Sequence, residues 1–397
     1  MSSGLRFDYC TNTVSCHMQS SGKMSLKPRG FSSTTKSKAC HLRLPTSTKY
    51  NPFDLKNTGD LTPALQPSIP DPDCPSKPLI RCISNKFPAL GDSLEMAVLK
   101  KSHQKTAGHM NGLACGYQEV IIQHWNWRFC QALMSTEQMI LLWTTLQTRC
   151  KVNRAKNNVK YIQLMENHGI RSGASLPHPH SQILALPFVP PDQMARLEIA
   201  AKYYSNNNEQ NIFDAVIDGA RKDGRIVYET ENAISIIPYA INRSYETWII
   251  SKTSGCIDTE THMNEMADVI RRSLLMLYNS IDDPDYNSIV RNAIDIKEMH
   301  NVDVNKWYKW HVVVTPHGKT STWGGIKGYG DFVPITGTPE EHAENLRMCI
   351  DMPSPLQSIL LNEKIKVSAT TQSPSAVAFG RKIFGVVMLI NFVGMYI

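Results

Sequence analysis

Two histidines and a glutamine alternate along one short segment, residues 166–182, which reads ENHGIRSGASLPHPHSQ. In a β-strand, successive side chains point to opposite faces, so His178, His180 and Gln182 would share one face. Two imidazoles and a side-chain amide would then converge on one site.

The loop ahead of these histidines carries small residues at Gly169, Gly173 and Ser175. Small residues let backbone N–H groups approach a phosphate closely. Neutral histidine is a good nucleophile at pH 7, so His180 beside such a loop suits attack on phosphorus in two successive displacements. Gln182 could hold a non-bridging phosphate oxygen as charge develops. Two other interpretations stay open: ordinary surface or core histidines, and a two-metal His-x-His site.

Two similar runs of elements are expected to position this segment. Each run has a strand, then a helix, then two more strands, and the first helix begins with a capping box between Ser135 and Gln138. We therefore expect an α+β fold made of two duplicated half-domains, each an antiparallel sheet with packed helices, rather than a single long sheet. The strands are expected at 116–123, 160–166, 178–186, 245–252, 286–293 and 310–315, and the helices from Ser135, at 263–277 and from Thr338.

The charge of the chain lies mostly at one end. The 397 residues carry a net charge of +7, and residues 1–70, with nine Lys or Arg and three Asp or Glu, account for +6 of it. A nucleic-acid-binding domain usually carries its own basic excess, so no nucleic-acid partner is expected. The ten cysteines include no CxxC pair and follow no secretory signal peptide, which indicates reduced thiols inside the cell.

The two ends differ in composition from the middle of the chain. Residues 1–50 are basic and rich in Ser and Thr, as in a transit peptide, and residues 51–78 contain seven prolines, as in an extended arm. Residues 383–397 are apolar, but a membrane span needs roughly 20 such residues, so membrane attachment is not expected. The predicted parts are a poorly ordered leader and arm at 1–70, an N-terminal catalytic half at 71–205, a C-terminal half at 206–350 and a tail of unknown structure at 351–397.

The segment HPHSQ, preceded by ENHG and SGAS, resembles the active-site segment of the galactose-1-phosphate uridylyltransferase family, within the histidine-triad superfamily. IRCISNKFPAL, GYQEVII, YETWIISK and YKWHVVVTP resemble other stretches of that family, over about residues 70–350. The resemblance implies two histidine-triad-like halves, which are usually assembled as a homodimer.

The resemblance also implies roles for individual residues. His180 would attack the α-phosphate of a nucleotide sugar and carry the nucleotidyl group, with Gln182 as its phosphate-binding partner. The substrate-binding residues would be Asn85, Asn167, Gly173 and Ser175.

The metal sites of the family are only partly matched here. The first, a zinc site, would use His178, His124 and Cys74, but Lys77 stands where a second cysteine belongs, so the ligand set is incomplete. At the second, Lys309 replaces one histidine of a His-x-His pair. His311 is therefore expected to be packed or hydrogen-bonded rather than catalytic.

The resemblance implies a nucleotidyltransferase, first of all a UDP-glucose–hexose-1-phosphate uridylyltransferase of galactose metabolism. Its partners would be a nucleotide sugar and a sugar 1-phosphate. Two alternatives stay open: an ADP-glucose phosphorylase-like adenylyltransferase, which would use inorganic phosphate, and a non-catalytic nucleotide-binding homologue. A cytoplasmic location is expected, or an organellar one if residues 1–50 are a transit peptide.

Overall fold

The computed structural model describes residues 4–8, 13–18, 51–90, 105–106, 109–110, 115–294, 298–299, 302–317 and 333–352. The predicted transit peptide falls largely outside the described residues, and the apolar C-terminus at 383–397 lies wholly outside them. No helix in the described part of the chain has the length and apolar character needed to cross a membrane. Seven of the cysteines in this part, from Cys74 to Cys349, carry free thiols.

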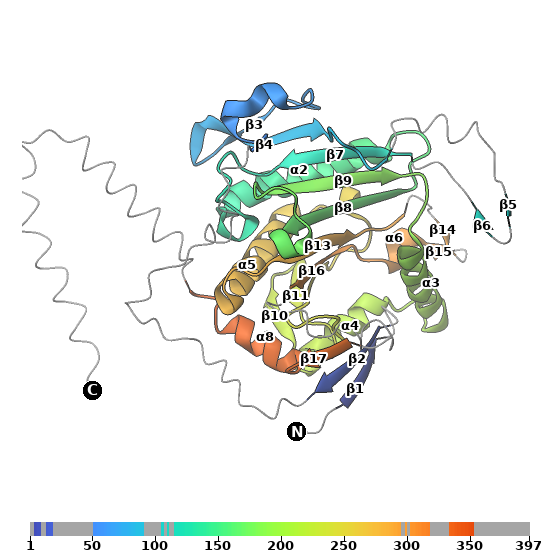
Figure 1. Ribbon diagram of the computed structural model, residues 1–397. Helices are drawn as coiled ribbons and strands as arrows, with labels where there is room; N and C mark the ends of the chain where they lie inside the picture. Colours follow the sequence, from blue (N-terminus) through green and yellow to red (C-terminus); the bar gives the residue numbers. More distant parts are fainter. Residues whose placement is uncertain are drawn as a thin grey trace, which may run out of the picture. The chain divides into compact units, whose positions relative to one another are not determined.

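A single antiparallel sheet of ten strands forms the centre of the described structure, in the order β10-β11-β12-β16-β13-β8-β9-β7-β4-β3 (Figure 1). The predicted strands are confirmed within a few residues. The bounds of the ten strands are β3 Ile69–Asp71, β4 Cys74–Ser84, β7 Tyr117–Ile122, β8 Tyr161–His168, β9 His180–Leu186, β10 Ile226–Glu229, β11 Ala233–Ile236, β12 Thr247–Ser251, β13 Tyr286–Arg291 and β16 His311–Pro316.

The same order of elements occurs twice along this sheet. β4, β7, helix α2 (Thr136–Arg154), β8 and β9 are followed by β11, β12, helix α5 (Met263–Ile281), β13 and β16. In both sets, the strand that comes fourth in the sequence lies in the sheet between the second and the third strands. The duplication itself stays a prediction from the sequence.

The prediction of two separate sheets is wrong, because β8 pairs with β13 and joins the two sets of strands. In two separate sheets, both strands would be edges with unpaired backbone N–H and C=O groups. Pairing them satisfies these groups and removes two exposed edges. The consequence for the site is that strand β13, from the second half of the chain, lies directly beside β8 of the first.

Helices α2 and α5 pack against each other and cover one face of the sheet (Figure 1). The predicted capping box of Ser135 and Gln138 opens α2, and its apolar stripe of Met139, Leu142, Trp143 and Leu146 is buried. On β8 the residues that face α2 are buried, whereas the alternate residues Gln163, Met165 and Asn167 are only half-buried. We call the face of β7, β8 and β9 turned away from α2 the open face.

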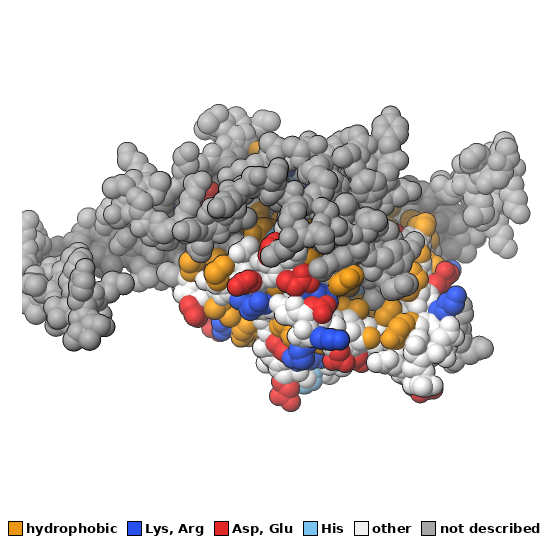
Figure 2. All heavy atoms as spheres, turned by 90° about the horizontal axis from the view of Figure 1, so that it is seen from below, with side chains coloured by type: hydrophobic (Ala, Val, Ile, Leu, Met, Phe, Trp, Pro, Cys, Tyr) orange, Lys and Arg blue, Asp and Glu red, His pale blue; other side chains and the backbone are white. Residues whose placement is uncertain are grey.

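The remaining elements extend this core. The helix predicted from Thr338 is confirmed: Thr338 caps it and Pro339 stands at its first position. On the face shown in Figure 2, acidic, basic and apolar side chains of the described residues are intermixed. The other elements are β1 Gly4–Asp8, β2 Thr13–Met18, β5 Lys105–Thr106, β6 His109–Met110, α3 Pro191–Asn206, α4 Ile212–Lys222, β14 Glu298–Met299, β15 Val302–Asp303, α6 Val304–Trp307, β17 Val333–Thr336 and α8 Pro339–Arg347.

Candidate active site

The structure brings the two histidines of the HPH segment against one aromatic ring. His180 opens strand β9 and His178 lies just before it. The ring of Phe53 makes edge contacts with both imidazoles, with centroid distances of 5.8 Å to His178 and 5.3 Å to His180. Phe53 belongs to the segment 1–70 that was predicted as leader and arm, so this segment contributes a contact to the two histidines.

One of the two ring nitrogens of His180 makes a hydrogen bond. Its Nδ1 lies 2.8 Å from the backbone oxygen of His178, which can only accept, so the proton is on Nδ1 and Nε2 keeps its lone pair. Among the described residues, Nε2 has no hydrogen-bond partner. Burial lowers the pKa of His180, although the hydrogen bond to His178 opposes the shift. The ring is therefore neutral at pH 7 and has a lone pair available for nucleophilic attack.

The side-chain amide of Gln182 is oriented by a chain of two hydrogen bonds. The backbone N–H of Ala89 donates to Oε1 of Gln118 at 2.8 Å. The Nε2 group of Gln118 in turn donates to Oε1 of Gln182 at 2.9 Å. Because the oxygen of Gln182 is engaged, its NH2 group remains as the donor. Gln118 was not identified from the sequence, although the alternation of GYQEVII places it on the open face of β7 with Val120.

Asn167 on β8 is oriented in the same way, but by the second half of the chain. The Nδ2 group of Asn287 on β13 donates both to Oδ1 of Asn167, at 2.7 Å, and to the backbone oxygen of Ser172, at 2.9 Å. His317 bonds the oxygen of Asn287 at 2.5 Å. The NH2 group of Asn167 therefore remains as a donor. The register of β8 and β9, continued by one residue, places Asn167 opposite His180 on the open face.

The small residues of the loop between β8 and β9 differ in their surroundings. Gly169 has φ +82°, and a Cβ there would lie 2.3 Å from a carboxylate oxygen of Asp285, so this position requires glycine. Asp285 accepts from the backbone N–H of Arg171 at 2.8 Å, which ties the loop to the start of β13. Gly173, with φ +88° and open space around it, is exposed, as is Ser175.

Asn85, predicted to contact the nucleotide, lies at the end of β4 beside the Gln118 backbone. Its backbone N–H donates to the oxygen of Gln118 at 2.9 Å, and its side-chain oxygen accepts from the backbone of Phe87 at 3.0 Å. It is half-buried, next to the strand that carries the amide partner of Gln182. The structure thus brings Asn85 close to Gln118, whereas it shows no contact of Gly173 or Ser175 with His180.

The three predicted zinc ligands do not fit a metal site. Nδ1 of His178 lies 3.0 Å from the amide nitrogen of Asn51, and Nε2 lies 2.7 Å from the backbone oxygen of His124, so both ring nitrogens are engaged. The ring of His124 stacks on Phe129, and Cys74 contacts Ser76 on the half-exposed start of β4. Within the described residues, no three His, Cys, Asp or Glu side chains are grouped as metal ligands.

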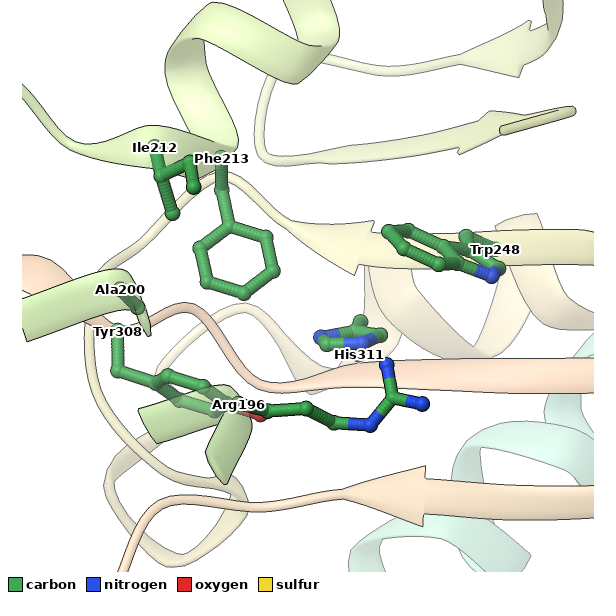
Figure 3. Close-up of a pocket in the computed structure, with 7 residues that line it drawn as sticks. All are labelled: Arg196, Ala200, Ile212, Phe213, Trp248, Tyr308 and His311. Carbon is green, nitrogen blue, oxygen red and sulfur yellow. The ribbon is translucent and has the colours of Figure 1, made fainter. Parts of the chain in front are cut away.

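His311 is packed and hydrogen-bonded, as predicted. Its Nδ1 lies 3.0 Å from the backbone oxygen of Lys309, the same local bond that His180 makes. Figure 3 shows its ring among Trp248, Phe213 and Tyr308, with the guanidinium of Arg196 nearby. Burial lowers the pKa of His311 to about 3. Lys309, which stands where a histidine pair would need its first member, has its amine 3.3 Å from the carboxylate of Asp214.

Comparison with known proteins shows which family this chain resembles. Residues 77–190 match the family model for the N-terminal domain of galactose-1-phosphate uridyl transferase. The ADP-glucose phosphorylase of Arabidopsis thaliana is 24% identical over 250 residues, which cover 61% of this chain and 67% of that protein. The galactose-1-phosphate uridylyltransferase of Thermotoga maritima is 26% identical over 230 residues, which cover 54% and 67% of the two chains.

Solved structures agree on the fold. The crystal structure of the Arabidopsis thaliana ADP-glucose phosphorylase with bound ADP-glucose has a TM-score of 0.68 at 21% identity, over 87% of this chain and 98% of that one. A uridylyltransferase structure has a TM-score of 0.61 at 16% identity, over the same shares of the two chains. The family model and the relatives make the chain similar to the galactose-1-phosphate uridylyltransferase family of nucleotidyltransferases, together with an ADP-glucose phosphorylase, and the solved structures share its fold.

Proposed function

We propose that the chain transfers a nucleotidyl group from a nucleotide sugar to a phosphate acceptor through a covalent bond to His180. The observation that carries this proposal is the state of that imidazole, which is neutral, bonded through Nδ1 and unengaged at Nε2. Gln182 lies two residues further along the same strand and Asn167 lies across from it. Each of these side chains has its oxygen occupied and its NH2 group left as a donor.

In the first step, the Nε2 lone pair of His180 attacks the α-phosphorus of the nucleotide sugar. An N–P bond forms, and the bond from that phosphorus to the bridging oxygen breaks. The sugar 1-phosphate leaves with that oxygen and the bonding electron pair. The ring now carries a positive charge, and the bond from its Nδ1–H to the carbonyl of His178 becomes charge-assisted and stronger. The amide donors of Gln182 and Asn167 bind the non-bridging oxygens as their charge develops.

In the second step, an oxygen of the acceptor phosphate attacks the same phosphorus. The N–P bond breaks and its electron pair returns to Nε2, which restores the neutral ring. No proton has to leave or reach the imidazole in either step. The Nδ1–H bond to His178 therefore persists throughout and keeps the nucleophile oriented.

The first candidate for the donor and acceptor is UDP-glucose with a hexose 1-phosphate, as in the uridylyltransferases of galactose metabolism. The second is ADP-glucose with inorganic phosphate, which the sequence similarity to the Arabidopsis thaliana ADP-glucose phosphorylase supports, as the similarity to the Thermotoga maritima uridylyltransferase supports the first. The same imidazole serves both, because the two reactions differ only in the base and in the acceptor. A homodimer remains a further prediction from the resemblance.

The proposal predicts a covalent intermediate that can be trapped. We expect protein incubated with UDP-glucose or ADP-glucose labelled in the α-phosphate to keep the label after denaturation and to lose it at acid pH, as a phosphoramidate does. Rates with UDP-glucose and galactose 1-phosphate, compared with ADP-glucose and phosphate, then decide between the two candidates. If neither nucleotide sugar labels the protein, the chain is a non-catalytic homologue and the covalent mechanism is wrong.

The orientation of Gln182 predicts the effect of a change at Gln118. In Gln118→Glu, an acceptor replaces the NH2 group that bonds Oε1 of Gln182, so the amide of Gln182 must turn and present its oxygen to the substrate. We expect kcat to fall about 10²-fold, the usual effect of one lost transition-state donor. Gln163→Glu, on the open face of β8, is the control and should leave kcat within a few-fold. Equal kcat values for the two variants would contradict this role of Gln118.

A further inference from the structure

The segment Asn51-Pro52-Phe53 contacts both histidines of the HPH segment, although it lies more than a hundred residues away in the sequence. We propose that Asn51 is a positioning residue whose hydrogen bond to His178 takes the place of a metal ion and thereby places His180 for reaction. This inference rests on the nucleotidyl transfer proposed above.

The amide of Asn51 has one possible orientation. Its Oδ1 accepts from the backbone N–H of Phe53 at 3.1 Å, and a backbone N–H can only donate. The NH2 group of Asn51 therefore faces His178 and donates to Nδ1 at 3.0 Å. The backbone oxygen of Asn51 is also held, because it accepts from the side chain of Asn57 at 2.8 Å.

This donor sets the tautomer of His178. With its Nδ1 lone pair engaged by Asn51, the neutral ring carries its proton on Nε2, where it donates to the backbone oxygen of His124 at 2.7 Å. The two bonds hold the ring from opposite sides. They also hold the peptide unit of His178, whose oxygen accepts the Nδ1–H bond of His180. A continuous set of hydrogen bonds thus runs from Asn51 through His178 to the proposed nucleophile.

Two further contacts support a site organised without a metal ion. The ring of Phe53, only 7% exposed, fills the space beside both imidazoles. The buried guanidinium of Arg81 donates to the backbone oxygen of Phe53, and its charge acts on His178. A fixed positive charge at this place disfavours a divalent cation. A metal ligand would need a free lone pair on His178, and neither ring nitrogen has one.

The test compares Asn51→Asp, Asn51→Ala and the control Lys56→Ala, an exposed side chain of the same segment. Asn51→Asp keeps the shape and the bond to Phe53 but puts an acceptor against Nδ1 of His178. We expect kcat to fall about 10- to 100-fold in both Asn51 variants, as for other residues that orient a reactive group. KM should stay within a few-fold, because Asn51 does not touch the substrate, and Lys56→Ala should match the wild type.

Three measurements make the outcome decisive. Long-range 1H–15N correlation spectra of histidine-labelled wild-type protein should show His178 protonated on Nε2, and Asn51→Asp should move the proton to Nδ1 or add a second one. Metal analysis should find well under one zinc per chain, and a chelator should leave kcat unchanged. Wild-type kcat in the Asn51 variants, a His178 ring protonated on Nδ1, or one zinc per chain bound by His178 would each overturn the proposal.

The spectra and the metal analysis do not depend on catalysis. If the wild-type protein transfers no nucleotidyl group, the proposed function fails, while the tautomer of His178 still decides whether Asn51 holds it. If Asn51→Ala does not fold, the isosteric Asn51→Asp provides the kinetic comparison.

Discussion

Replacing His180 by alanine is expected to lower kcat for nucleotidyl transfer by about 10⁴- to 10⁶-fold, the effect seen when an enzyme loses its covalent nucleophile. The reason is that Nε2 of this ring is the atom proposed to form the N–P bond, and no other described histidine combines an unengaged nitrogen with flanking amide donors. Label from the α-phosphate should no longer remain on the denatured protein. Binding of the nucleotide sugar, measured by calorimetry, should change much less than kcat.

The control for this variant is His262→Ala, because His262 is a half-exposed histidine at the start of α5, outside the candidate site. Its kcat should match that of the wild-type protein. Both variants should keep the wild-type unfolding midpoint to within a few degrees. A His180→Ala protein that still forms the labelled intermediate would show that another residue is the nucleophile.

The second large effect concerns stability. Arg149 on α2 makes two hydrogen bonds to the carboxylate of Glu119 on β7, at 2.8 and 2.6 Å, and both side chains are less than 10% exposed. Arg149→Met should lower the free energy of unfolding by about 3–5 kcal/mol, because it leaves the carboxylate buried beside only Lys156, whose amine is 3.8 Å away. Urea unfolding followed by circular dichroism measures this change.

A double variant separates the contribution of the ion pair to stability from that of side-chain packing. In Arg149→Met with Glu119→Leu no buried charge is left unpaired, so most of the lost stability should return. Arg272→Met, which breaks a more exposed pair with Asp268, should cost less than about 1 kcal/mol. A double variant no more stable than Arg149→Met alone would mean that the loss comes from packing rather than from the unpaired carboxylate.

Local features of the chain could be predicted because their causes are local. The alternation in HPHSQ places His180 and Gln182 on one face of β9, and the structure confirms the strand. The capping box of Ser135 and the cap residue Thr338 act on residues at most three positions away, so the starts of α2 and α8 could be predicted from the sequence. The requirement for glycine at position 169 was also visible as a loop signal, although its reason, the carboxylate of Asp285, was not.

Long-range pairing could not be predicted in the same way. No local pattern in the residues of β8 and β13 indicates that these strands pair. Two sheets were therefore expected where the structure has one. The resemblance to the family placed zinc ligands at Cys74 and His124, whereas the side chain that contacts His178 is Asn51, 127 residues away in the sequence. Asparagine in a proline-rich arm gives no sign of such a contact.

The sequence by itself determined which groups the proposed chemistry can use, namely His180 and, two residues further along the same strand, the amide of Gln182. Only the tertiary structure decided how these groups are oriented. An amide has a donor and an acceptor of nearly equal shape, and which of them faces the substrate depends on the partner that engages the other. For Gln182 and Asn167 those partners, Gln118 and Asn287, are 64 and 120 residues away in the sequence, and only folding brings them together.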